Sequence, residues 1–325
     1  MYKNILFAVI IAIFAGCSAP KPQQAPSWFT NLPKDYKNFY AVAAASDETK
    51  AKSIAINELR KNIIKDLDAS FSTPNHSLSP SSQMLNEIIS ANLHLANTLS
   101  MRAIKVEKTE LFNGQILMLI SIQREELFKK INSDLNTKIK RLGQFYSLNK
   151  DTIPIKRYVY LKPLMSQYAY LASRTAFAQI SISTYNSNNN FRLLKELENE
   201  YNNLQTSINF YILSDGNSRV YTKTIKDAIE KDGLSVSNKS KDSHTLKLLI
   251  SSSTDNTNEY TFNVSKNLVK FTTFDANKNQ ILFRQHTFIG KSRKNHQDAK
   301  EQTIEHINAK VKQLGIFDFI GIQSK

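Results

Sequence analysis

The stretch AIKVEKTELFNGQILMLISI, residues 103–122, decides the fold of the N-terminal half of this chain. Asn113 and Gly114 separate two runs that contain β-branched and apolar residues, and Asn-Gly is a pair that two-residue hairpin turns favour. The pattern therefore predicts a β-hairpin that pairs residues 103–111 with residues 115–122. The second run is apolar at both alternate sets of positions, so we expect it to be the central strand of a sheet.

Further elements flank this hairpin on both sides. We predict a strand over residues 39–45, a helix that begins at Ser46, a second helix over residues 83–99 and a long helix from Arg124. Ser46 is a favoured capping residue, and the apolar positions that follow it recur at four-residue spacing. The order strand, helix, helix, strand, strand, helix indicates a small α+β domain over residues 36–148.

The beginning of this domain carries a more specific pattern. It consists of an aromatic-proline stretch, WFTNLP (28–33), a strand that ends in small residues, YAVAAA (40–45), and an alanine-spaced helix, KAKSIAINEL (50–59). Followed by the hairpin, it resembles the Lpp-type membrane-associated lipoproteins of epsilonproteobacteria, the group that includes the flagellar basal-disk lipoprotein FlgP. The resemblance spans residues 28–148, with alanines at 43–45 where the family usually has glycines. It implies a non-enzymatic component of the disk around the flagellar motor, needed for motility.

The rest of the chain predicts a helical connector over residues 149–207 and a second α+β domain over residues 208–325. In the connector we expect Pro163 to bend a helix or to begin one. The tyrosines of this region form either the inner face of a helical hairpin or an exposed docking surface. They are Tyr158, Tyr160, Tyr168 and Tyr170.

The C-terminal domain begins strand, helix, strand and continues as an antiparallel meander that a long helix over residues 295–314 closes. This order predicts an open, mostly antiparallel sheet with helices on one face. The expected strands cover residues 208–212, 234–236, 246–252, 259–267, 268–274 and 281–289.

The long helix of the N-terminal domain extends beyond its own sheet. Residues 124–146 would span roughly 35 Å as a helix, whereas strands of this kind span roughly 20 Å. We therefore expect the distal apolar residues Ile139, Leu142 and Phe145 to pack on something else. The partner is either the helical region after Asn149 or a neighbouring protomer, and the second alternative makes these three residues a protein interface.

The N-terminus predicts export and lipid anchoring. Lys3 precedes an apolar run, and the tetrapeptide FAGC, residues 14–17, resembles a bacterial lipobox. The resemblance implies removal of residues 1–16 as a signal peptide, cleavage between Gly16 and Cys17, and diacylglycerol and palmitate on Cys17. The alternative is an ordinary cleaved signal followed by a lone buried cysteine. Ser18 in place of aspartate implies outer-membrane sorting, and residues 17–35 are assigned to the lipidated cysteine and a proline-rich tether.

Composition limits the classes of partner. The chain has one cysteine, so the mature protein has no pair for an intramolecular disulfide. A net charge of +15 often marks a nucleic-acid binder, but the export signal removes nucleic acid from the expected partners. Basic and acidic residues alternate along the predicted helices. The basic surface is therefore either simply solvated, or it attracts lipopolysaccharide, peptidoglycan carboxylates or an acidic protein.

Motifs of catalysis and metal binding are not found in the sequence. None of the six histidines lies three to five residues from another, and there is no Gly-x-Ser-x-Gly motif. We expect the histidines to lie on the surface, and Glu196, Glu198 and Glu200 to occupy a solvated helix face. The sequence thus predicts no enzyme, no metal and no cofactor.

These observations together predict a lipid-anchored scaffold on the periplasmic face of the outer membrane. Its expected partners are the membrane itself, through the lipid, and other envelope or flagellar disk proteins in an oligomeric assembly. Two alternatives remain open at this point: an auxiliary lipoprotein of envelope assembly or transport, and a surface-exposed adhesin.

Overall fold

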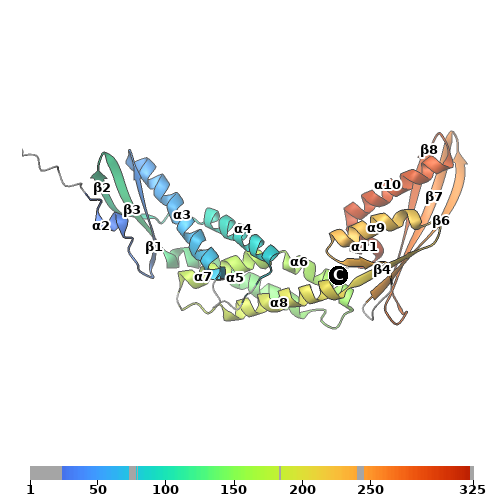
Figure 1. The fold of residues 1–325 in the computed structure, drawn as a ribbon, viewed down its shortest axis with the longest axis horizontal. Coiled ribbons are helices and arrows are strands. Elements are labelled where there is room, and N and C mark those ends of the chain that lie inside the picture. Colours follow the sequence, from blue (N-terminus) through green and yellow to red (C-terminus); the bar gives the residue numbers. More distant parts are fainter. Residues whose placement is uncertain (1–23, 73–77, 79, 183, 240–244, 323–325) are drawn as a thin grey trace, which may run out of the picture. The chain divides into compact units, whose positions relative to one another are not determined.

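The computed structural model describes residues 24–72, 78, 80–182, 184–239 and 245–322 of the 325-residue chain. Helices and mostly antiparallel sheets alternate along it, so the fold class is α+β, as predicted (Figure 1). The described residues divide into two compact units: those within 24–72, 92–132 and 176–185 form the first, and those within 78–91, 133–175 and 186–322 form the second. The expected domains 36–148, 149–207 and 208–325 stay a prediction. Among the described helices, none is long and apolar enough to cross a membrane.

The sheet of the first unit has three antiparallel strands. Strand β3 (Gln115–Gln123) lies between β1 (Asn38–Ala45) and β2 (Lys105–Phe112) and is buried from Leu117 to Ile122, which confirms its prediction as the central strand. The turn between β2 and β3 has positive φ at Asn113 (47°) and Gly114 (78°), as a tight hairpin of this type requires. The predicted hairpin is therefore confirmed.

Helices complete the first unit. In α3 (Glu48–Ser72), Ala51 and Ala55 are fully buried, and their small side chains allow the helix to pack closely on β1. Helices α4 (Ser82–Thr98) and α5 (Arg124–Ser147) begin within one residue of where they were expected. Helix α4 begins in the second unit and ends in the first, whereas α5 begins in the first unit and ends in the second. A short helix, α2 (Ser27–Thr30), contacts β3. Part of the segment that we assigned to the tether is therefore folded.

Three helices form the connector region. They are α6 (Pro154–Met165), α7 (Tyr168–Ser181) and α8 (Asn188–Ser207). Proline occupies the first position of α6, and Pro163 lies inside that helix, close to its end. Tyr158 and Tyr168 are fully buried, so these two tyrosines belong to the core and not to an exposed docking surface.

The second unit contains a five-stranded sheet in the order β5-β4-β6-β7-β8. Its strands are β4 (Asn209–Ser214), β5 (Ser235–Ser237), β6 (Thr245–Glu259), β7 (Phe262–Phe274) and β8 (Gln280–Ser292). The short pairings of β4 with β5 and β6 are parallel, and the two long pairings are antiparallel.

The strand predictions in the meander were partly wrong. Residues 259–267 and 268–274 were expected as two strands, but residues 262–274 form the single strand β7. Strand β6 continues to Glu259, through residues 253–258, for which no strand was predicted. These residues are exposed on both faces of the sheet, so this part of β6 lacks the alternating apolar pattern from which strands are recognised.

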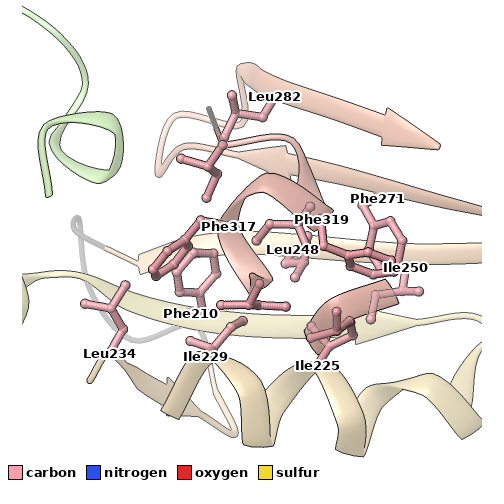
Figure 2. Close-up of a cluster of buried hydrophobic side chains, with 14 of the residues drawn as sticks. Phe210, Ile225, Ile229, Leu234, Leu248, Ile250, Phe271, Leu282, Phe317 and Phe319 are labelled. Carbon is pink, nitrogen blue, oxygen red and sulfur yellow. The ribbon is translucent and has the colours of Figure 1, made fainter. Parts of the chain in front are cut away.

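The core of this unit lies between the sheet and helices on one of its faces. Helices α9 (Arg219–Lys231), α10 (His296–Leu314) and α11 (Ile316–Ile320) cover that face (Figure 1). Figure 2 shows the buried cluster, to which the strands contribute Phe210 and Phe271, α9 contributes Ile225, and α11 contributes Phe319. Gly290 permits the close approach of α10, because a Cβ atom there would lie 1.8 Å from the carbonyl oxygen of Ala299.

Candidate binding surface

No helix of the described residues covers the second face of the C-terminal sheet. Side chains alternate between the two faces along each strand. In β7 the odd-numbered residues 265–273 are buried under the helices, whereas Lys266 and Lys270 on the other face are exposed. In β8, Phe288 is buried, and Phe283 and Ile289 point to the open face. We call this surface, formed by β4, β6, β7 and β8, the open sheet face.

Apolar side chains are exposed on the open sheet face. Phe283 is 49% exposed and Ile289 48%, and both lie on β8. Leu213 lies on the same face, on β4, three strands away from β8, and is 38% exposed. Leu213 pairs in register with Leu249 of β6, and Leu249 with Thr272 of β7, so the three strands present one continuous surface.

Lysines cross the same surface. Lys266 pairs in register with Ile289, and Lys270 pairs with Gln285. Lys291 binds Glu259 at 3.0 Å, which neutralises its charge. Within the described residues, neither Lys266 nor Lys270 makes a salt bridge, although Asp255 of β6 lies opposite Lys266 in the register. The open sheet face thus combines apolar side chains with exposed cations.

The predicted lipidation site lies outside the described part of the chain, whereas the predicted interface on α5 lies within it. Gly16 and Cys17 lie outside the described residues. On α5, Leu142 is 2% exposed, Ile139 is half-buried, and Phe145 is 50% exposed. Burial of Leu142 within one chain favours the first of the two expected partners, the helical region after Asn149.

Contacts around this part of α5 are consistent with that partner. The hydroxyl of Tyr160 on α6 donates to the carbonyl of Phe145 at 2.9 Å. A Cβ atom at Gly143 would lie 3.5 Å from the side chain of Leu193 of α8, an ordinary van der Waals distance, so the two helices are neighbours here. Phe145 nevertheless keeps half of its surface exposed, so an interface role for this residue stays a prediction.

Two of the three glutamates on α8 are not on a solvated face, contrary to expectation. Glu198 is 5% exposed, and its carboxylate accepts hydrogen bonds from the Tyr168 hydroxyl at 2.7 Å and from the backbone N–H of Ser81 at 3.3 Å. The carboxylate of Glu200 binds Arg157 at 2.7 Å. Spacing along a helix did not reveal either contact, because the partners lie far away in sequence.

Arg157 is the most heavily bonded of these side chains. It is 2% exposed, and it donates to both carboxylate oxygens of Glu200 and to the carbonyls of Tyr146 and Leu148. The hydrogen bonds from Arg157 are the main reason that the pKa of the Glu200 carboxyl lies below its usual value. This network joins the end of α5 to α6 and α8, and it is structural in character.

His286 is also an exception to the expected surface position of the histidines. Its ring stacks on Phe319 with centroids 4.5 Å apart, and Nε2 lies 2.8 Å from the Phe319 carbonyl oxygen. Burial lowers the pKa of the imidazole. Among the described residues, no three His, Cys, Asp or Glu side chains are grouped so that they could hold a metal ion.

Comparison with known proteins identifies no family. No family model and no curated protein matches the chain. A minor lipoprotein from Acinetobacter baumannii is similar over 35% of this chain and 95% of its own, with 13% identity and a TM-score of 0.28. The secreted protein HP1454 from Helicobacter pylori covers 86% of this chain and 98% of its own, with 11% identity and a TM-score of 0.32. The match to lipoprotein GNA1162 from Neisseria meningitidis covers 33% of this chain and 96% of that protein, with 11% identity and a TM-score of 0.24. Similarities this weak carry no argument about function.

Proposed function

We propose that this protein is a non-enzymatic, lipid-anchored scaffold of the cell envelope, whose open sheet face binds an acidic partner protein. The observation that carries the proposal is the combination of half-exposed Phe283 and Ile289 with the exposed Lys266 and Lys270 on one sheet surface. The anchor is proposed from the lipobox-like residues 14–17, and the location is the periplasmic face of the outer membrane.

The mixed chemistry of the surface favours a protein over a polysaccharide partner. Acidic sugars or peptidoglycan carboxylates would satisfy the lysines but would leave the apolar side chains in water. A protein partner buries apolar side chains at the centre of the contact and pairs charges around them. Charge complementarity also speeds the encounter, because the whole chain carries a net charge of +15.

Among envelope assemblies, we propose the flagellar basal disk. This part of the proposal rests on the resemblance of residues 28–148 to the FlgP-like lipoproteins, and the additional C-terminal half makes the chain more similar in organisation to the disk partner protein FlgQ. An auxiliary lipoprotein of envelope assembly or transport, and an adhesin, are the alternative functions.

The anchor is tested with Cys17→Ala. The wild-type protein should incorporate labelled palmitate and fractionate with the outer membrane, and the variant should do neither. Cys17→Ser serves as a second variant that keeps a polar side chain of similar size. Unchanged outer-membrane fractionation of both variants, without acyl label on the wild type, would show that Cys17 is not the anchor.

The binding surface is tested by complementing a deletion strain with the double variant Lys266→Glu, Lys270→Glu. The matched control is Lys223→Glu, on the exposed side of α9. The double variant should fractionate normally but fail to restore disks in images of the motor and swimming in soft agar, whereas the control should restore both. Intact disks in the deletion strain itself would contradict the flagellar proposal. Full rescue by the double variant would contradict the role of the open sheet face.

A further inference from the structure

Strand β6 is paired on both sides along only part of its length. Strand β4 pairs with β6 from Thr245 to Ile250, whereas β7 pairs with it as far as Glu259. From Ser251 to Glu259, the side of β6 that faces away from β7 has no neighbouring strand among the described residues. This segment of nine residues is a sheet edge in the middle of a strand, and we call it the β6 edge.

The backbone groups that point outward from the β6 edge can be assigned from two contacts. The N–H of Asp215 donates to the carbonyl of Ile250 at 3.2 Å, and the N–H of Ser252 donates to the carboxylate of Asp215 at 3.2 Å. Backbone N–H and C=O groups point to the same side at every second residue of an antiparallel strand. Thr254, Asn256 and Asn258 therefore also direct their N–H and C=O groups outward, and no protein partner for these groups exists in the described part of the chain.

The β6 edge has few of the features that usually prevent strand pairing. Native edges are protected by lysines, prolines, bulges or short length. Residues 251–259, SSSTDNTNE, contain no lysine, arginine or proline, and β6 runs against β7 without a bulge; Asp255 and Glu259 are the charged residues of the segment. The edge strand β2 in the first unit is different, because it carries Lys105 and Lys108 and has a register shift between Val106 and Lys108. The β6 edge is thus a template for another strand.

We propose that the β6 edge binds the same edge of a second copy of this chain, antiparallel, with Asn256 opposite Asn256. The two five-stranded sheets then become one continuous sheet, and about six backbone hydrogen bonds form between the copies, counted from the outward-pointing residues. The proposal stands independently of the lipid anchor and of the partner on the open sheet face.

Space and charge select this register over its neighbours. Centring the pair on Asp255 places two carboxylates directly opposite each other, which is destabilising. Centring it on Thr254 moves the partner strand alongside Ile250, where β4 already lies. Centring it on Asn256 places Thr254 opposite Asn258, Asp255 opposite Thr257 and Ser253 opposite Glu259. No two acidic residues then face each other, and the partner strand ends before it reaches β4.

The first test measures the mass of the full chain in solution, with Cys17→Ser to remove its single thiol. Sedimentation velocity should show a dimer whose dissociation constant rises at least tenfold in Asn258→Pro, because proline removes an outward N–H that donates across the interface. The matched control is Asn258→Ala, which keeps the backbone donor and should leave the dimer unchanged. A chain that is monomeric at its solubility limit, or a dimer that Asn258→Pro does not weaken, overturns the proposal.

A second test reports the register without relying on a proline. Paired residues at the centre of the interface have Cα atoms roughly 5.5 Å apart, within the range of a disulfide. The two copies of residue 258 would be displaced by four residues, roughly 13 Å along the strand. Under mild oxidation, Asn256→Cys should therefore cross-link much faster than Asn258→Cys. Equal rates, or a faster reaction of Asn258→Cys, would exclude the Asn256-centred register.

Discussion

The hydroxyl of Tyr168 donates a 2.7 Å hydrogen bond to the carboxylate of Glu198, although the Glu198 side chain is almost completely buried. The backbone N–H of Ser81 donates to the same carboxylate at 3.3 Å. Burial, with this hydrogen bond, raises the pKa of the Tyr168 phenol, so the hydroxyl remains a donor throughout the physiological range. A single carboxylate thus connects α7, α8 and the segment that begins α4.

Tyr168→Phe should destabilise the protein by about 1.5–3 kcal/mol, because it removes one of the donors to a buried carboxylate and leaves that oxygen unsatisfied. The ring is retained, so apolar packing changes little. The free energy of unfolding from urea titration measures the effect.

Tyr160→Phe is the matched control for that substitution. Its hydroxyl also donates a hydrogen bond, to the Phe145 carbonyl, but in an exposed position where water can replace it. We expect a loss of less than about 1 kcal/mol. Equal losses for the two variants would mean that the burial of Glu198 does not increase the contribution of its hydrogen bond to the free energy of unfolding.

Arg157→Lys should destabilise the protein by about 2–4 kcal/mol, even though it keeps the positive charge. A lysine cannot reproduce the bidentate pair with Glu200 together with the hydrogen bonds to the carbonyls of Tyr146 and Leu148. Arg192→Lys is the control, since Arg192 is 72% exposed and lies 4.0 Å from Glu196. That control should change the free energy of unfolding by less than about 0.5 kcal/mol. A similar loss in both variants would argue against a special role for the buried network.

The features that could be predicted from the sequence are those whose pattern is local. Asn113-Gly114 favours a turn by its own backbone preferences, and the apolar run after it favours the middle of a sheet. In each of these cases, the residues that interact lie within a few positions of one another.

The features that were missed depend on residues far apart in the chain. Glu198 and Tyr168 are separated by 30 positions, and nothing in the spacing of the glutamates indicates that one of them is buried. The extension of β6 was missed because residues 253–259 pair with β7 without burying a face of the sheet. The open sheet face could not be predicted without the register of β7 and β8, because Lys266 and Ile289 become neighbours only when these two strands pair.

His286 should make stability depend on pH below neutrality. Burial is the largest cause that lowers the pKa of its imidazole below 6.5; nearby Arg284 and Lys310 lower it further, and the hydrogen bond to Phe319 opposes them. As the pH falls, His286 of the unfolded chain therefore binds a proton near pH 6.5, whereas His286 of the folded chain binds it only at a lower pH. The resulting contribution to stability is fully present above that pH and is lost as the pH falls toward the lower, folded value.

His286→Phe should make the free energy of unfolding depend less steeply on pH between about pH 7 and 5. The decrease in slope should correspond to at most about one proton fewer taken up on unfolding. The phenyl ring keeps the stacking on Phe319, so the fold should persist. The internal control is the range above pH 7.5, where the curves of the variant and the wild type should run parallel. A slope that does not change below pH 7 would show that another group carries the acid sensitivity.

The apolar stripe at the end of α5 can be divided into an internal part and a surface part by comparing two substitutions to glutamate. Leu142 is 2% exposed, so Leu142→Glu places a charge in the core and should cost more than about 3 kcal/mol or prevent folding. Phe145 is 50% exposed, so Phe145→Glu should change the free energy of unfolding by less than about 1 kcal/mol.

Because the second variant, Phe145→Glu, stays folded, it can test the predicted interface without the ambiguity of the first. If the exposed half of Phe145 contacts another protein of the assembly, Phe145→Glu should abolish co-sedimentation with disk fractions while its urea midpoint stays close to that of the wild type. Normal co-sedimentation of this variant would restrict the stripe to packing within one chain, and the proposed scaffold would then have to assemble through other surfaces.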